Sequence, residues 1–343
     1  MNGNQSRQRL TLAVLKNTPT ILFVVIFVAF SLLDQRFFTW TNFENIISSS
    51  AFVGILAVGM TFVLLTGGID LSVGANMYIS GGILAIMLEQ GYPLWLAILA
   101  ALVSGTLIGL VNAFLISKVK IIPFMVTLGT LTAGRGLALL ITQSRAINVT
   151  KEMPFAAAHV LGIPLPIAVF AAVVFVAFIV LAYTAPGRQI YAMGNDPEAA
   201  KKAGLNVTRL TMFAYIACGF CAALATVIAL SQQGRLSASF GEGVEFRAIA
   251  AAVLGGTSLF GGVGAVFPGT VIGTLLVQMI STGLVYLQVD LYLQDMISPL
   301  VIFFAVFVDA QRMGLIKRLE RRNIRVEKTA GQVLSEKKAH SMI

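Results

Sequence analysis

One stretch of the chain carries polar and conformationally free residues where a plain membrane helix would not. Residues 64–74 read LLTGGIDLSVG, with an acid, two hydroxyls and three glycines between the apolar runs 52–65 and 77–88. Backbone polar groups in a bilayer core must be satisfied internally, and an acid there is costly. The composition predicts a sharp turn at a membrane surface or a broken helix lining a protected cavity. Either structure indicates a chain that handles something polar in a membrane.

A second glycine-rich break, at residues 254–265, echoes the first and also joins two apolar arms. Glycine-interrupted segments in corresponding places of two halves indicate a transport pathway between them. Close helix packing is the alternative use of such glycines. The residues assigned to helix breaking and gating in the two breaks are Gly67, Gly68, Asp70, Ser72, Gly74, Gly255, Gly256, Gly261 and Gly262. We expect Asp70 to cap or gate the first break rather than to bind a sugar.

The polar loop 186–207 is too long and too patterned for a simple connector. Asp196 is placed to cap a helix that starts at Pro197, and Gly204 is placed to end it. We expect this short helix to form a protruding docking site, or knob, for a soluble partner. A helix lying on the lipid headgroups is the alternative, but insertion into lipid favours large apolar residues, and those of this helix are small.

The composition is that of an α-helical membrane protein. Hydrophobic residues make up 57% of the chain and charged residues 11%, against roughly 25% charged residues in soluble domains. The net charge of +9 does not indicate nucleic-acid binding, because the basic residues gather at span ends and in the tail, as the positive-inside rule predicts. Cys218 and Cys221 lie in an apolar segment and are expected to be reduced packing residues.

About ten apolar segments reach or approach the length needed to cross a bilayer. They are 19–38, 51–66, 73–90, 94–117, 122–142, 166–184, 210–231, 248–260, 264–286 and 295–311. Residues 40–45 are interpreted as an interfacial element after the first span. Ten spans with a cytoplasmic N-terminus place the denser basic patches and the C-terminus on the cytoplasmic side. Segment 248–260 is short, so a re-entrant structure is the alternative there.

The predicted fold class is therefore all-α, a polytopic membrane protein with about ten transmembrane helices, glycine-rich helix breaks and a cytoplasmic coupling helix. The expected division is a cytoplasmic stub at 1–18, a transmembrane domain at 19–312 and a basic cytoplasmic tail at 313–343. Within the spans, Arg135 is expected to pair with Asp70 or a helix carbonyl. The residues assigned to a translocation path are Asn76, Asn112, Thr127 and Arg135, with hydrogen bonds between helices as the alternative.

Three ordered motifs resemble one known family over roughly residues 20–312. They are the GGIDLSVG break, the 187–204 loop and the run A-x-x-LGGTSL-x-GG-x-G ending at Gly264, and together they are similar to permease subunits of ribose, galactose and arabinose-type ABC importers. The resemblance implies a permease dimer, from two copies or a copy and a homologue. It also implies a cytoplasmic ABC ATPase and a periplasmic sugar-binding protein. ATPase-coupling residues implied by it are Gly187, Arg188, Ala192, Gly194, Asn195, Ala199, Ala200 and Gly204.

The expected energy source, argued from the residues alone, agrees with that resemblance. The chain lacks the G-x-x-x-x-G-K-[ST] sequence of a phosphate-binding loop, so ATP and Mg²⁺ are expected on the separate ATPase, with no cofactor or metal in this chain. We expect a multi-pass protein of the bacterial inner membrane that contacts lipid and moves a pentose, hexose or related furanose. A stand-alone secondary transporter or facilitator is the alternative, and a membrane anchor for a cytoplasmic enzyme leaves both glycine breaks unexplained.

Overall fold

The computed structural model describes residues 18–150 and 153–290, and the single residues 293, 294, 296, 300, 303 and 307. Almost all of these belong to one compact unit, residues 19–306. A second unit comprises residues 1–18 and 307–343. The predicted basic tail, and all but one residue of the predicted N-terminal stub, lie outside the described residues, so that division remains a prediction.

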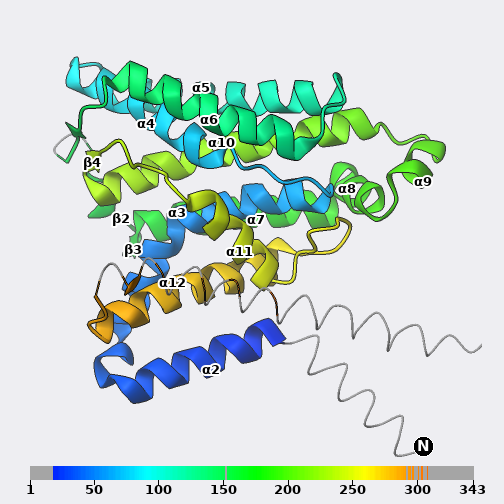
Figure 1. Cartoon of the computed structure of the whole chain (residues 1–343). Helices are drawn as coiled ribbons and strands as arrows, with labels where there is room; N and C mark the ends of the chain where they lie inside the picture. The colour runs from blue at the N-terminus through cyan, green and yellow to red at the C-terminus, as the bar shows by residue number, and fades with distance from the viewer. Residues whose placement is uncertain are drawn as a thin grey trace, which may run out of the picture. The chain divides into compact units, whose positions relative to one another are not determined.

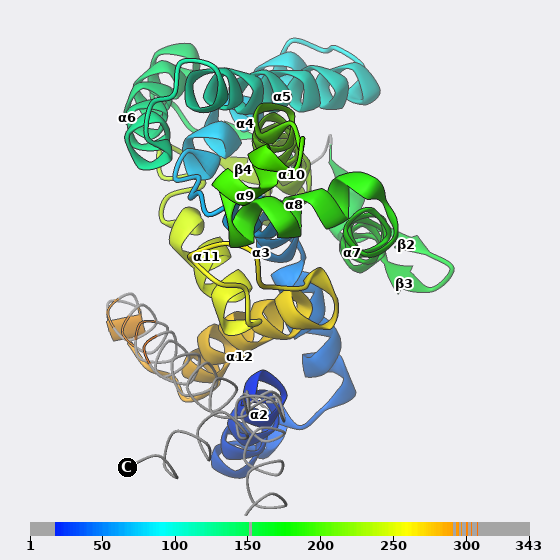
Figure 2. The ribbon, with the colours of Figure 1, turned by 90° about the vertical axis from the view of Figure 1, so that its right-hand side faces the viewer.

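Two long helices form the centre of the larger unit: α3 (Trp40–Leu65) and α10 (Val207–Gln233) pack along each other and are mostly buried. On one side α4 (Val73–Glu89) and α5 (Leu94–Ser117) pack on α10, and α6 (Pro123–Thr142) packs on α4 and α5. Another group packs on α3, namely α7 (Leu165–Tyr183), α11 (Val244–Leu254) and α12 (Val271–Tyr286). Figures 1 and 2 show the two groups on either side of the central pair.

Shorter elements complete the described part of the chain. The helical ones are α2 (Thr18–Leu33), η1 (Gln35–Phe37), η2 (Pro154–Ala156), α8 (Ala185–Asn195), α9 (Pro197–Lys202) and the π-helical turn η3 (Val266–Thr270). Two antiparallel pairs of short strands are β1 (Ile147–Asn148) with β4 (Arg235–Leu236) and β2 (His159–Val160) with β3 (Ile163–Pro164).

Small residues allow α5 and α10 to approach closely. Ala101, Gly105 and Gly109 recur at every fourth position of α5 and are buried. A Cβ atom on Gly109 would lie 2.6 Å from the Tyr215 carbonyl oxygen, and one on Gly219 would lie 2.7 Å from the Gly109 Cα. Membrane helices associate mainly through such packing, because lipid is as apolar as the side chains it replaces. The four-residue spacing of Ala101, Gly105 and Gly109 is visible in the sequence, but the sequence analysis did not single it out.

The helices run alternately up and down between two ends of the unit. We call the end at which α3 finishes and α8 begins the coupling end; Figure 1 shows it on the right, with α9 protruding. The basic residues of the loops at this end are Lys118, Lys120, Arg188, Lys201, Lys202 and Arg209. At the opposite end Arg36 and Arg145 pair with Asp34 and Glu89. Among the described residues, basic side chains therefore outnumber the acidic Asp196 and Glu198 at the coupling end.

Six helices are long and apolar enough to cross a membrane, and two shorter apolar helices accompany them in the described residues. This confirms a mainly helical, polytopic membrane protein. The separate interfacial element predicted at 40–45 is wrong, because α3 is continuous from Trp40. Thr39 caps its start by accepting a hydrogen bond from the Asn42 amide at 3.3 Å, and no glycine or proline interrupts the chain before residue 54.

The predicted segment 248–260 is also corrected. The helix found there is α11, which starts earlier, at Val244, and ends at Leu254. Its 11 residues extend roughly 16 Å, about half the hydrocarbon thickness of roughly 30 Å. The helix alone does not span the bilayer, but α10 ends opposite the coupling end and the loop after α11 contacts Leu65 at the coupling end. The segment 234–254 therefore runs from one end of the bundle to the other as a loop followed by a short helix, which is not a re-entrant structure.

The packing of α5 on α10 generates a first prediction. Gly219→Leu is expected to destabilise the protein by roughly 1–3 kcal/mol, because the added side chain must displace backbone of α5. The measurement is thermal unfolding in detergent. Gly129→Leu is the matched control, since a Cβ on that exposed α6 glycine meets nothing within 4 Å. Equal midpoints for the two variants would contradict the packing argument.

Candidate coupling site and buried polar network

Three motifs that are far apart in the sequence meet at the coupling end. They are the end of α3 with its break (65–68), the last turn of α8 (191–195) and the loop 258–264. We call the place where these three segments meet the junction. The Gly262 amide donates a hydrogen bond of 3.0 Å to the Leu65 carbonyl oxygen. A Cβ atom on Gly194 would collide with that same oxygen and with the Gly262 nitrogen. The three backbones are therefore in direct contact, with no side chain between them.

Side-chain hydrogen bonds hold α8 in this position. The Asn195 amide nitrogen donates to the Tyr191 carbonyl at 2.9 Å and to the Gly262 carbonyl at 3.4 Å. The Tyr191 hydroxyl donates to the Gly264 carbonyl at 2.9 Å. Burial raises the pKa of Tyr191, which keeps the phenol in the protonated, donating form. The last two turns of α8 are thus bonded to the glycine loop by two side chains.

The predicted helix at Pro197 is confirmed with both of its ends. The Asp196 carboxylate accepts a hydrogen bond from the Ala199 amide at 2.9 Å. Gly204 has a positive φ of 85°, and the Leu205 amide donates to the Ala200 carbonyl, which is the Schellman ending of a helix. The sequence reasoning missed the preceding helix α8, so Arg188 lies inside a helix rather than before one. Thr184 followed by Pro186 was the available signal for its start.

The predicted coupling residues separate into two sets. Three face inward and are buried: Gly187, Gly194 and Ala200. Five are exposed: Arg188, Ala192, Asn195, Ala199 and Gly204. The buried set fixes α8 and α9 to the bundle, and the exposed set lies on the protruding knob that Figure 1 shows at α8 and α9.

Both glycine breaks end their helices in the same way. The Gly68 amide donates to the Val63 carbonyl at 3.2 Å, and the Thr257 amide donates to the Ala252 carbonyl at 3.0 Å. The residues with positive φ are Gly67 at 77° and Gly256 at 92°. These are matching Schellman caps, so the repeat seen in sequence extends to local backbone structure. Gly255 has a different role, because a Cβ there would lie 2.7 Å from the Thr270 nitrogen.

Behind the first break lies a chain of buried hydrogen bonds that ties three helices together. The Thr130 hydroxyl donates to the Asn112 amide oxygen at 2.7 Å, and the Asn112 amide donates to the Ser72 hydroxyl at 2.7 Å. Ser72 in turn donates to Asp70 from its hydroxyl at 2.6 Å and from its amide at 2.9 Å. Asp70 is 1% exposed. Its carboxylate therefore stabilises the turn that leads into α4, and its assignment to capping or gating the break remains a prediction.

The predicted path residues Asn76, Asn112 and Thr127 are all buried in this structure. Asn76 donates to the carbonyls of Gly105 and Gly219 at 3.0 and 3.3 Å, joining α4 to α5 and α10. Thr127 donates to the Pro123 and Ile69 carbonyls. In this conformation the three residues hold helices together, and their assignment to a translocation path remains a prediction.

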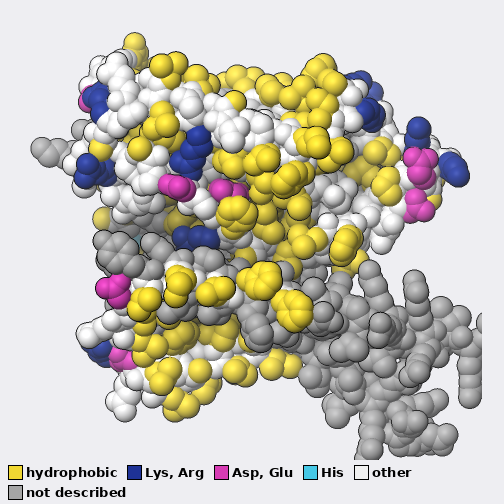
Figure 3. All heavy atoms as spheres, in the orientation of Figure 1, with side chains coloured by type: hydrophobic (Ala, Val, Ile, Leu, Met, Phe, Trp, Pro, Cys, Tyr) yellow, Lys and Arg dark blue, Asp and Glu magenta, His cyan; other side chains and the backbone are white. Residues whose placement is uncertain are grey.

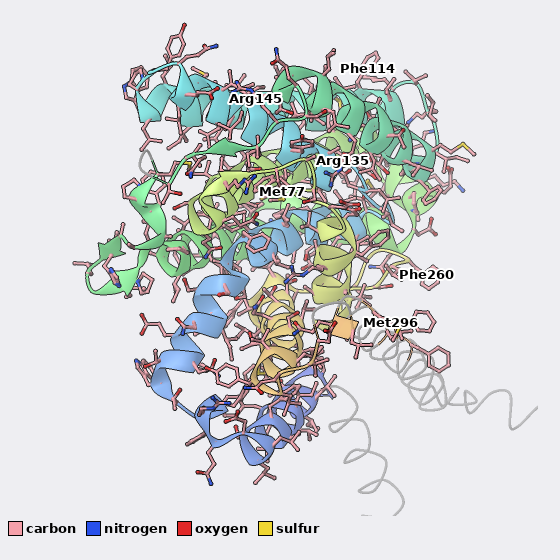
Figure 4. The ribbon with its side chains drawn as sticks, turned by 60° about the vertical axis from the view of Figure 1, so that its left-hand side comes forward. Met77, Phe114, Arg135, Arg145, Phe260 and Met296 are labelled. Atoms are coloured by element: carbon pink, nitrogen blue, oxygen red, sulfur yellow. The ribbon has the colours of Figure 1, made fainter. Side chains whose placement is uncertain are left out.

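Arg135 has a different partner from the one predicted. Its Nη1 donates to the Phe240 carbonyl at 2.9 Å, and its guanidinium lies over the Tyr78 ring, 5.6 Å from the centroid. The expected pair with Asp70 is wrong, because Asp70 is satisfied by Ser72. The carbonyl partner comes from the loop before α11 rather than from a helix. Figure 4 shows Arg135 between Arg145 toward one end of the bundle and Phe260 toward the other.

The two cysteines are free and buried, which confirms their predicted packing role. A Cβ atom on Gly59 of α3 would lie 2.7 Å from the Cys221 Cβ and 3.1 Å from the Cys218 Cα. The C-x-x-C pair thus lies on the face of α10 that meets α3.

Comparison with known proteins agrees with a membrane-spanning transport component. A family model described as "Branched-chain amino acid transport system / permease component" matches residues 42–306. The ribose import permease protein RbsC of Haemophilus influenzae is 35% identical over 315 residues, 90% of this chain and 97% of the relative. RbsC of Bacillus subtilis is 39% identical over 297 residues, covering 85% and 91% of the two chains.

A further relative, the galactofuranose transporter permease protein YtfT of Escherichia coli, is 36% identical over 283 residues, covering 81% of this chain and 83% of the relative. No solved structure matches the chain. Broken helices and a protruding loop-helix pair on a polytopic bundle are features of a membrane permease. The chain belongs to the family of transport-system permease components that the model describes.

The buried network generates the second prediction. Asn112→Leu is expected to lower stability by roughly 1–3 kcal/mol, because Ser72 and Thr130 each lose a buried partner. Thr132→Val is the control, since that exposed α6 hydroxyl bonds only to carbonyls of its own helix. Thermal unfolding in detergent compares the two. An Asn112→Leu midpoint within error of Thr132→Val would disprove a stabilising network.

Proposed function

We propose that this chain is the permease subunit of an ABC importer that moves a monosaccharide across the bacterial inner membrane by alternating access. The observation that carries the proposal is the junction, where Gly194 of the α8–α9 knob meets the backbone of both glycine breaks and the Tyr191 and Asn195 side chains bond α8 to the second break. The named relatives that cover more than four fifths of the chain import ribose and galactofuranose. We therefore assign a sugar rather than the amino acid in the name of the family model.

ATP and Mg²⁺ belong to a separate cytoplasmic ATPase in this proposal, because the chain has no phosphate-binding sequence. The exposed residues of the knob, Arg188, Ala199 and the lysine pair 201–202, form the surface that the ATPase would contact. A periplasmic sugar-binding protein would deliver substrate at the opposite end. The permease itself then hydrolyses nothing and supplies the pathway.

Ten membrane crossings fit the chain direction. The candidates are α2, α3, α4, α5, α6, α7, α10, α11, α12 and a last segment, 295–311, that lies largely outside the described residues. Of these α11 is too short to cross alone. This arrangement places both termini on the coupling side, and the basic loops of that side make it cytoplasmic.

A second permease copy, identical or homologous, is proposed for the face shown in Figure 3. That face is largely apolar, yet Lys or Arg and Asp or Glu side chains appear in its middle. Glu242 is exposed in the loop between β4 and α11. Charges in contact with acyl chains are costly. A protein partner or a shared aqueous pathway suits this face better than lipid does, whereas lipids cover the uncharged helices.

The junction suggests how force would reach the pathway. A displacement of α9 moves α8, and α8 has no side chain at Gly194 to absorb the movement. The ends of both α3 and α11 must therefore follow. A secondary transporter, the alternative, would need an ion-coupled acid, and Asp70 is already bonded twice to Ser72.

Reconstitution tests this proposal. The permease in proteoliposomes should take up radiolabelled ribose or galactose only with an ATPase partner, its binding protein and ATP present together. Uptake by the permease alone, driven by an ion gradient and abolished in Asp70→Asn, would instead establish a secondary transporter.

The third prediction concerns the junction itself. Gly194→Ala should lower ATP-driven uptake by about tenfold, equivalent to about 1.4 kcal/mol, because the added methyl group separates α8 from Leu65 and Gly262. Gly136→Ala is the matched control, because a Cβ on that exposed α6 glycine, away from the knob, meets nothing within 4 Å. Co-purification of the ATPase checks assembly separately. Full uptake by Gly194→Ala would show that direct backbone contact is not required for coupling.

A further inference from the structure

A cavity of about 1370 Å³ lies between α3, the end of α10, the start of α11 and the middle of α12. Its lining combines amide and hydroxyl side chains with one cation, one carboxylate (Glu242) and aromatic rings. The residues that carry the argument are Ser48, Phe52, Gln232, Arg247, Gln278 and Ser281. Asn76, Asn112, Thr127 and Arg135 are not among its lining residues. The cavity is therefore distinct from the predicted path residues and from the junction.

Arg247 is the lining residue whose charge costs the most free energy to place at membrane depth. Its Nη2 donates to the Gln278 amide oxygen at 3.3 Å, and its guanidinium lies 5.8 Å from the centre of the Phe52 ring. No carboxylate of the described residues forms an ion pair with it. Glu242 lines the same cavity without forming an ion pair with Arg247. A cation at membrane depth that faces a cavity is a functional feature by default.

The amides of the lining retain unused hydrogen-bonding capacity. Gln232 donates from its amide nitrogen to the Ser48 carbonyl at 2.7 Å, and its amide oxygen accepts nothing within the described part of the chain. Gln278 accepts from Arg247 and donates to Thr282 at 3.3 Å. A side-chain amide offers two donors and two acceptor lone pairs. Each glutamine thus has both a donor and an acceptor position left for a ligand.

We propose that this cavity holds a neutral, polyhydroxylated monosaccharide in transit, an inference that rests on the proposed function. Sugar hydroxyls donate and accept, which matches amides and serines, and the Phe52 ring suits the C–H face of a sugar. A branched-chain amino acid in the cavity would instead place an aliphatic side chain against the amides and leave them unpaired, which is unfavourable. The cavity exceeds the usual roughly 300–1,000 Å³ of a small-molecule site, leaving room for water and for release.

The depth of the cavity fits import. Ser48 lies eight residues inside the start of α3, and Gln278 lies eight residues before the end of α12. Each is therefore roughly 12 Å from that end of its own helix, and Ser48 lies level with the end of α10, where Gln232 bonds to its carbonyl. A sugar delivered at the end of the bundle opposite the knob reaches this cavity before it reaches the junction.

The test uses the complete importer in proteoliposomes, with radiolabelled D-ribose and D-galactose as probes. Gln278→Leu should reduce sugar uptake about tenfold through loss of one amide, while ATP hydrolysis stimulated by the binding protein stays within about twofold of wild type. Thr132→Val, on the exposed face of α6, is the control and should change neither. Normal uptake by Gln278→Leu overturns the proposal.

Two further measurements distinguish failure of the cavity assignment from failure of the proposed function. If Gln278→Leu does not assemble with the ATPase, Ser281→Ala is judged by the same criteria. Wild-type uptake of L-leucine in preference to both sugars overturns the assignment of substrate class. Wild-type protein that shows no ATP-dependent uptake at all contradicts the proposed function itself, which is distinct from failure of the cavity assignment.

Discussion

The architecture of the coupling end depends on one contact that excludes side chains. Gly194 touches the Leu65 carbonyl and the Gly262 backbone at once, and even a methyl group there would overlap both. Such an approach requires glycine on α8, an unobstructed helix end on α3 and left-handed glycines in the loop 258–264. Three motifs that looked separate in the sequence are therefore one structural unit, and each explains why the other two are rich in glycine.

Local chemistry made part of this structure predictable. The cap at Asp196, the stop at Gly204 and the helix ends at both breaks follow from rules that act within a few residues. The cavity could not be predicted in that way. Ser48, Arg247 and Gln278 meet only because α3, α11 and α12 pack together, and none of the three carries a local signal beyond being polar in an apolar segment. The start of α11 was not predicted, because the two charged residues in its first turn, Glu245 and Arg247, are typical of a loop.

Polar residues in apolar helices proved the hardest to interpret from sequence. Asn76 is as plausible on a pathway as between helices, and the choice depends on whether a carbonyl is within reach. Gly105 and Gly219 decide it, because a glycine leaves its own carbonyl uncovered on the packed face. The glycines that let α5 approach α10 are thus the same ones that provide partners for Asn76. Packing and polar satisfaction are coupled here.

The junction and the cavity share two helices, which gives the proposed transport a physical route. Ser48 and Phe52 line the cavity from α3, and the same helix ends at Leu65 in the junction. Arg247 lines it from α11, whose capped end lies eight residues further on, roughly 12 Å away. Because each segment is helical between cavity and cap, a shift imposed at the knob reaches the cavity lining without an intervening hinge. Arg247 and Phe52 lie on different helices, so a relative movement of α3 and α11 would change their separation and with it the shape offered to a sugar.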